Sequence, residues 1–153
     1  LQQLPELQGA TVVLEGCHSF EQASPYAVAG RLVERLLRQL AEQDAQPAQR
    51  SAYEQLAALL PAWERFLPLL KPLVGGAFPP SGISDGLAPA LQRERLHELV
   101  TALVRAAARA RPLALIVDDL QWADGSSRAL LEHLAREAGH VPLLLVLADR
   151  LAV

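Results

Sequence analysis

The sequence has 153 residues, a formal net charge of -3 and a hydrophobic fraction of 51%. A chain of this length and apolar content can bury a core, which excludes a disordered segment and predicts one domain or most of one. The mild acidity argues against a dedicated nucleic-acid surface, and a single cysteine, Cys17, excludes a disulfide framework.

The longest apolar run, Val141–Ala148, is far shorter than the roughly 20 residues of a membrane-spanning helix. We therefore expect a cytoplasmic protein that does not enter a membrane. The sequence contains no methionine, so we also expect these residues to be a piece of a longer chain.

The first half of the chain alternates apolar runs with helical periodicities. The β-branched run after Gly9 predicts a buried strand over residues 10–15. Leucines at helical spacing predict an amphipathic helix over residues 25–43, with Pro25 near its start. A shorter helix is expected before Pro61. Frequent Pro and Gly then predict an irregular insertion over about residues 68–89.

The second half continues the same alternation. Apolar residues at helical spacing predict a long helix over residues 90–110, and Leu113–Val117 is typical of a strand buried on both faces. Asp124 is placed to cap a following helix, and residues 143–148 form a third apolar strand. This order predicts an α/β fold with a parallel sheet and right-handed crossovers.

Two acids, Asp118 and Asp119, directly follow the buried strand. The carboxyl ends of parallel strands form the edge where ligands bind in open α/β sheets. In a phosphate-transfer enzyme the first acid would hold Mg²⁺ and the second would orient or deprotonate the attacking water. The alternative, that both acids are merely solvated or cap the next turn, stays open on this pattern alone.

A family resemblance rests on three stretches, which are GCHSFEQASPY, LALIVDDLQWADGSSRALLEHLAR and PLLLVLADR. They resemble the ATPase module of the STAND class, signal-transduction P-loop ATPases of large bacterial regulators and of some cyclase or kinase fusions. The resemblance covers roughly residues 10–30 and 93–150. It implies a partial P-loop NTPase of the ASCE type, a three-layer sandwich with three retained parallel strands and flanking helices, over residues 1–153.

The resemblance also implies roles for individual residues. Asp118 would bind Mg²⁺ as the Walker B carboxylate, and Asp119 would be the second, catalytic carboxylate, which acts on the attacking water. Arg150, after the third strand, would be the sensor that approaches the γ-phosphate of ATP, a role that suits a permanently charged guanidinium. Gln121 either touches the nucleotide or satisfies backbone groups. Trp122 is expected to bury its ring under the following helix.

The phosphate-binding loop G-x-x-x-x-G-K-[ST] does not occur in the sequence, whose only lysine, Lys71, is followed by Pro72. The resemblance places that loop upstream and makes Leu1–Leu7 the end of its helix. The strand that carries the loop would then pair with residues 143–148. We expect these residues alone to be inactive toward ATP and, with that edge unpaired, poorly soluble or oligomeric.

The sequence thus predicts the nucleotide-binding part of a STAND-type signalling ATPase, a conformational switch in a multidomain and transcriptional regulator. Its expected partners are ATP or ADP, the rest of its own polypeptide and a second copy, with DNA bound only through another domain. An AAA+ ATPase of another branch is one alternative, although those enzymes usually carry a small polar residue where Arg150 stands. A non-catalytic interaction module that docks through the helices at 25–43 and 90–110 is the other.

Overall fold

A computed structural model of the chain describes residues 9–43 and 50–150. Three strands, five α-helices and three 3₁₀ segments make up these residues, so the expectation for Leu1–Leu7 lies outside them. The strands are β1 (Thr11–Gly16), β2 (Leu113–Asp118) and β3 (Leu143–Leu147). The α-helices are α1 (Ala27–Glu42), α2 (Ala52–Leu59), α3 (Gly82–Asp85), α4 (Pro89–Ala110) and α5 (Gly125–Glu137), and the 3₁₀ segments are Ser19–Glu21, Pro61–Leu70 and Leu120–Trp122.

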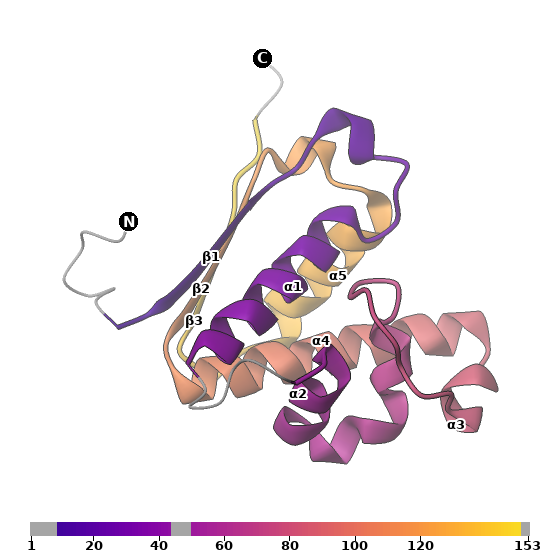
Figure 1. Cartoon of the computed structure of the whole chain (residues 1–153). Coiled ribbons are helices and arrows are strands. Elements are labelled where there is room, and N and C mark those ends of the chain that lie inside the picture. The colour runs from indigo at the N-terminus through magenta and orange to yellow at the C-terminus, as the bar shows by residue number, and fades with distance from the viewer. Residues whose placement is uncertain (1–8, 44–49, 151–153) are drawn as a thin grey trace.

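The three strands form one parallel sheet in the order β1-β2-β3. The central strand is β2, whose residues from Leu113 to Val117 are all buried. Its continuous apolar run fits a position with a neighbour on each side. This sheet, with its flanking helices, confirms the predicted α/β class of a partial P-loop domain (Figure 1).

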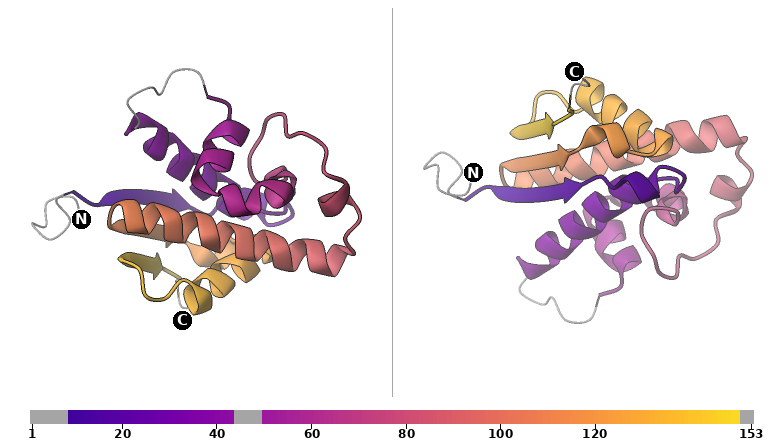
Figure 2. Two further views of the ribbon diagram at one scale, coloured as in Figure 1. Left: turned by 90° about the horizontal axis from the view of Figure 1, so that it is seen from below. Right: turned by 90° about the horizontal axis from the view of Figure 1, so that it is seen from above.

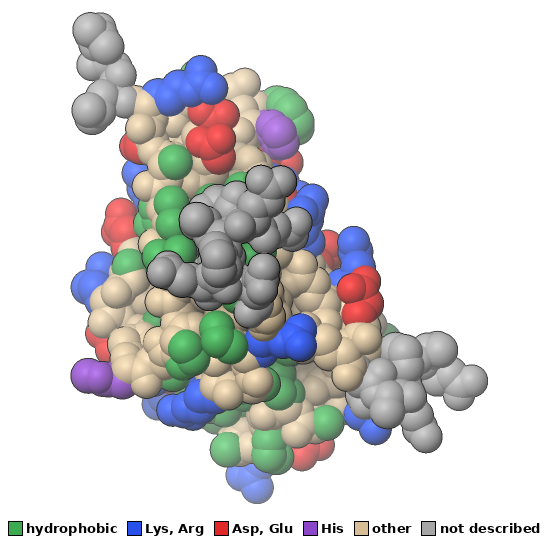
Figure 3. Space-filling model, turned by 90° about the vertical axis from the view of Figure 1, so that its left-hand side faces the viewer, with side chains coloured by type: hydrophobic (Ala, Val, Ile, Leu, Met, Phe, Trp, Pro, Cys, Tyr) green, Lys and Arg blue, Asp and Glu red, His purple; other side chains and the backbone are tan. Residues whose placement is uncertain are grey.

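The two faces of the sheet differ sharply. Val13, Leu115 and Val117 face the core, and α1, α4 and α5 all lie on that side of the sheet (Figure 1). On the opposite face Leu144 and Val146 remain 47% and 37% exposed, and hydrophobic side chains gather there (Figure 3). The described residues therefore make two layers of the three that the resemblance implies.

The helices pack because each carries an apolar stripe. The core cluster takes Leu32 and Leu36 from α1, Leu99 and Leu103 from α4, and Leu130 from α5. Seen from below, α4 runs between the α1 and α2 side of the molecule and the α5 and β3 side (Figure 2).

One close backbone approach requires a glycine in α1. A Cβ on Gly30 would lie 2.8 Å from the carbonyl oxygen of Leu73. The segment after the 3₁₀ helix therefore packs directly on α1, and Leu73 and Val74 are buried there.

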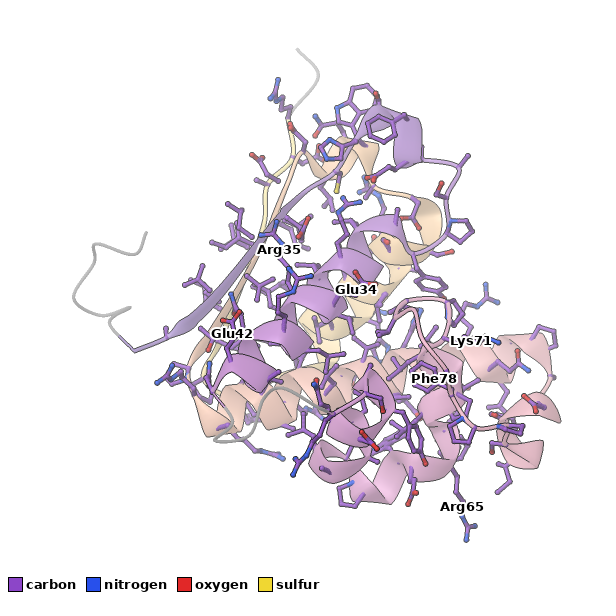
Figure 4. The ribbon with its side chains drawn as sticks, in the orientation of Figure 1. Glu34, Arg35, Glu42, Arg65, Lys71 and Phe78 are labelled. Atoms are coloured by element: carbon purple, nitrogen blue, oxygen red, sulfur yellow. The ribbon has the colours of Figure 1, made fainter. Side chains whose placement is uncertain are left out.

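The outer edge of β1 is closed by side chains from α1. Residues spaced four apart on a helix lie on one face, and here that face follows the strand. Three side-chain hydrogen bonds link Arg31 to the carbonyl of Gly16, Arg35 to that of Leu14 and Gln39 to that of Val12. Arg35 accordingly lies between α1 and β1 (Figure 4).

The outer edge of β3 has no such cover among the described residues. Leu113 N–H donates to the carbonyl of Pro142, and Ala148 N–H donates to that of Val117. Because backbone groups alternate in direction along a strand, Leu145 and Leu147 direct theirs away from β2. The sheet is thus closed at one edge and open at the other.

Two element boundaries correct the sequence prediction. α1 begins at Ala27 rather than near Pro25, because Tyr26 adopts a left-handed conformation with φ 60°. The 3₁₀ segment runs through Pro68 to Leu70, where irregular backbone was expected, since 3₁₀ geometry tolerates this proline and buries Leu67 and Leu70. No helix in the described part of the chain is both long and apolar enough to cross a bilayer.

We expect the open β3 edge to cause self-association, because an exposed apolar edge strand can pair with another chain. Sedimentation velocity should show oligomers of the unmodified chain at high concentration and mainly monomer for the double variant Leu144→Lys and Val146→Lys. Leu91→Lys, at an exposed leucine of α4, should not change the association. A monodisperse, concentrated monomer of the unmodified chain would contradict this placement of the edge.

A buried histidine lies between α4 and α5. His97 is buried, its ring centroid is 5.4 Å from that of His133 on α5, and its Nε2 atom has no hydrogen-bond partner in the structure. Burial lowers the pKa of His97, and the nearby His133, Arg93 and Arg136 lower it further. The folded state therefore disfavours protonation of this imidazole.

This lowered pKa predicts a loss of stability in mild acid. As pH falls below the unfolded value of about 6.5, the unfolded chain takes up a proton that the folded chain still refuses. The free energy of unfolding should fall toward lower pH until the folded His97 also titrates, with a limiting slope of about 1.4 kcal/mol per pH unit. Urea unfolding across pH 5–8 should show a flatter profile for His97→Gln than for the unmodified chain, and equal profiles would contradict the lowered pKa of His97.

Candidate functional site

The carboxyl ends of the three strands lie side by side at one edge of the sheet. Gly16 is paired with Asp118 in the β1 and β2 register, and Cys17 N–H donates to the carbonyl of Asp118 at 3.0 Å. On the other side, Leu120 N–H donates to the carbonyl of Ala148 at 2.9 Å. The segments that follow each strand are thereby held together above the sheet.

Asp118 and Asp119 leave β2 at this edge in two different ways. The Asp118 carboxylate is exposed, and its Oδ1 accepts the backbone N–H of Asp119 at 2.8 Å. Asp119 adopts φ 54° and ψ 44°, a left-handed conformation that aspartate tolerates better than most residues. The chain turns sharply there into the 3₁₀ segment. As a result, the carboxylates of Asp118 and Asp119 have different partners.

Asp119, Gln121 and Arg150 form one polar network. Arg150 Nε lies 2.8 Å from Asp119 Oδ1, and Gln121 Nε2 donates to the same oxygen at 3.2 Å. The Gln121 side-chain oxygen accepts the backbone N–H of Arg150 at 3.3 Å. Gln121 therefore joins the acid after β2 to the arginine after β3, a role that its sequence context left open.

Asp124 fixes the far end of the same turn. Its buried carboxylate accepts the N–H groups of Ser127 in α5 and of Tyr26 and Ala27 at the start of α1, at 2.8, 2.8 and 3.0 Å. The predicted cap of α5 thus also caps α1. Nearby, the Ser127 hydroxyl accepts Ala29 N–H, which adds a second link between the two helices.

The prediction for Trp122 is wrong. Its side chain is 41% exposed, and Leu120 is the residue of this 3₁₀ segment that enters the core. The left-handed Asp119 rotates the segment so that Leu120 faces inward and Trp122 faces outward.

Sequence reasoning missed a buried acid beside the site. Glu15, on β1, is paired with Arg31 Nε at 3.0 Å and with Arg35 Nε, so both its charge and its position are fixed by α1. The only sequence signal for this acid was the alternation along β1, which puts Glu15 on the same inward face as Val13. The adjacent Cys17 is buried, and burial raises the pKa of its thiol although Arg31 opposes this, so it stays protonated.

Of the two acids that follow β2, Asp118 is the one whose carboxylate could hold a magnesium ion. No cluster of three or more potential metal ligands occurs in the described residues, and none of their cations pairs with Asp118. Mg²⁺ is commonly held by one or two carboxylates, with water and substrate phosphates as the other ligands. A single unpaired carboxylate at a sheet edge meets that requirement, whereas Asp119 is already neutralised by Arg150.

Comparison with protein families gives one match. The model described as "AAA ATPase domain" matches residues 1–146, which includes Asp118, Asp119 and Gln121 but ends before Arg150. Comparisons with curated proteins and with solved structures gave no significant match.

The double cap by Asp124 predicts a large effect of substitution on stability. Asp124→Ala leaves three N–H groups without their acceptor and should lower the free energy of unfolding by at least ~2 kcal/mol. Asp124→Asn keeps one acceptor oxygen and should cost less, and Ser126→Ala, at a neighbouring position of the same helix, should cost little. Equilibrium urea unfolding measures all three, and equal stability of Asp124→Ala and the unmodified chain would disprove the double cap.

Proposed function

This chain belongs to the AAA ATPase domain family, and on that premise we propose that it is the metal-binding and phosphate-sensing part of a STAND-type signalling ATPase. The observation that carries the proposal is the convergence of Asp118, Asp119 and Arg150 at the carboxyl edge of the parallel sheet. Ligands of open α/β sheets bind at this edge.

Each residue then has a distinct task. Asp118 would hold Mg²⁺, and the bound ion would neutralise charge on the phosphate oxygens of ATP. Asp119 would orient or deprotonate the attacking water, and Arg150 would donate to the γ-phosphate through its guanidinium. Gln121 would position both groups, because it contacts both.

These roles require that Arg150 leaves Asp119 when the nucleotide binds. Its guanidinium is paired with Asp119, and its side chain is 79% exposed. An exposed ion pair is weak, typically below about 1 kcal/mol, so a phosphate group can compete for the arginine. Transfer of Arg150 to the phosphate would free Asp119 to act on water.

The phosphate cradle would come from a segment outside these residues. No G-x-x-x-x-G-K-[ST] motif occurs in the 153 residues, and the open edge of β3 offers a place for a strand that carries one. The residues shown here, tested alone, should therefore neither hydrolyse ATP nor bind it with micromolar affinity.

The wider role follows from the STAND resemblance of the DDLQWAD segment. Nucleotide state would switch the conformation or assembly of a cytoplasmic, multidomain transcriptional regulator, in which another domain binds DNA. The docking-module alternative has less support, because the apolar faces of α1 and α4 are buried in the core rather than available to a partner. An AAA+ enzyme of another branch is disfavoured by Arg150, because those enzymes usually carry a small polar residue at this strand end.

The test uses the protein that contains both this segment and a phosphate-binding loop. Asp118→Asn should lower Mg²⁺-dependent ATP hydrolysis about 100-fold or more, because the metal loses its protein carboxylate. Arg150→Ala should lower hydrolysis as well. Asp85→Asn, an exposed acid on α3, should leave hydrolysis unchanged.

Phosphate release measured in steady state reports hydrolysis, and calorimetry reports nucleotide binding. Full hydrolysis by Asp118→Asn would refute the proposed metal site. Absence of both hydrolysis and nucleotide binding in the unmodified protein would instead favour the docking module.

A further inference from the structure

A second hollow in the molecule lies away from the sheet edge. It is a cavity of about 490 Å³ between the end of the 3₁₀ segment Pro61–Leu70, α3, the first turns of α4 and Tyr26 at the start of α1. Its lining includes none of Asp118, Asp119, Gln121 or Arg150. Nothing in the proposed ATPase function uses it.

Two cations line this cavity without a counter-ion. Lys71 and Arg93 are both exposed, and neither side chain forms an ion pair or hydrogen bond within the described residues. Figure 4 shows Lys71 beside the first half of α4. The one acid in the lining is Asp85, so the cavity carries an excess of positive charge.

The neighbouring groups add to this positive character. The cavity includes Pro89, the first residue of α4, and the first turn of this 22-residue helix contains no acid to offset its positive end. Arg93 also lies close enough to Tyr26 to oppose the rise that burial causes in the pKa of the tyrosine hydroxyl. Tyr26 lines the same cavity, and its hydroxyl is a potential hydrogen-bond donor.

Apart from Ser84 and Gln92, the rest of the lining is apolar. Pro68, Leu69, Pro72 and Leu96 contribute walls beside the charged groups. The volume lies within the range of about 300–1,000 Å³ that small-molecule sites occupy. A cavity with apolar walls and two unpaired cations matches a ligand with an apolar body and an anionic head.

The larger groove of the molecule lacks this combination. It measures about 880 Å³ and lies between α4 and residues 59–63, and two of its three arginines are engaged. Arg95 pairs with Glu98 at 2.7 Å, and Arg105 donates to the carbonyl of Glu137. Three acids line it as well, so it offers no comparable excess of positive charge.

We propose that the cavity between the 3₁₀ segment, α3 and α4 binds a small organic anion, which is a phosphate monoester or a carboxylate with an apolar ring or chain. Lys71 and Arg93 bind the anionic head, and Pro68, Leu69 and Leu96 contact the body. The site is distinct from the sheet edge and does not depend on ATP chemistry. It is connected to that edge, since the backbone N–H of Tyr26 is held by Asp124.

The experiment titrates the whole chain with phenyl phosphate and, separately, with inorganic phosphate. Calorimetry measures the affinity, and amide NMR shifts locate the bound anion. We expect phenyl phosphate to bind more tightly than inorganic phosphate, because only the former uses the apolar walls. Lys71→Gln and Arg93→Gln should each weaken phenyl phosphate binding about tenfold, and added salt should weaken it further.

Arg65→Gln is the matched control. It removes one positive charge from the same 3₁₀ segment, but Figure 4 shows Arg65 directed away from the molecule. Its phenyl phosphate affinity should equal that of the unmodified chain. Thermal unfolding of each variant confirms that its fold is retained.

Three results would overturn the proposal. They are absence of phenyl phosphate binding at millimolar concentration, full binding by the double variant Lys71→Gln and Arg93→Gln, and equal affinity for phenyl phosphate and inorganic phosphate. Shifts of the amide signals of Tyr26 and Leu96 on titration would support the assigned location, whereas shifts confined to Asp118 and Asp119 would place the anion at the sheet edge and refute it.

Discussion

The structure depends on one buried carboxylate that serves two helices. Asp124 accepts backbone N–H groups from the starts of both α1 and α5, although these segments lie almost 100 residues apart in the chain. The first turn of a helix carries unpaired N–H groups and a positive partial charge, so an anion placed between two such ends satisfies both. It needs no arginine or lysine partner, because its charge is stabilised by backbone dipoles.

This constraint shapes the acidic turn. Asp118 is fixed by β2 and Asp124 by the two helices, so the chain between them must reverse direction within five residues. Asp119 accommodates the reversal by adopting a left-handed conformation. The same conformation allows its carboxylate to meet Gln121 and Arg150. A structural cap thus determines the geometry of the residues to which we assign chemistry.

Local sequence predicted the parts of the fold that local interactions determine. The buried strand Leu113–Val117 was predictable because a continuous apolar run fits only a central strand in this order of elements. The α5 cap was also predictable, because it joins two residues that are only three apart in the sequence, Asp124 and Ser127.

Most features that sequence reasoning missed depend on partners that are distant in the sequence. The start of α1 depends on Asp124, the closed edge of β1 depends on Arg31, Arg35 and Gln39, and His97 meets His133 only in the folded chain. The prediction that Trp122 is buried under α5 fails for a local reason, because after the left-handed Asp119 it is Leu120 that enters the core. Helical spacing identifies which face is polar, but it does not identify the strand or helix that this face contacts.

The two outer edges of the sheet differ in whether a further strand can pair with them. In a parallel sheet each outer strand directs half of its backbone groups away from its neighbour. At β1 these carbonyls are bonded by side chains of α1, which cannot leave without exposing the buried carboxylate of Glu15 that Arg31 and Arg35 also hold. Addition of a strand at β1 would therefore break a buried ion pair, whereas addition at β3 would break no interaction among the described residues. The proposed strand that carries a phosphate-binding loop would therefore join beside β3, the strand that leads to Arg150, and this position would bring its loop toward Asp118.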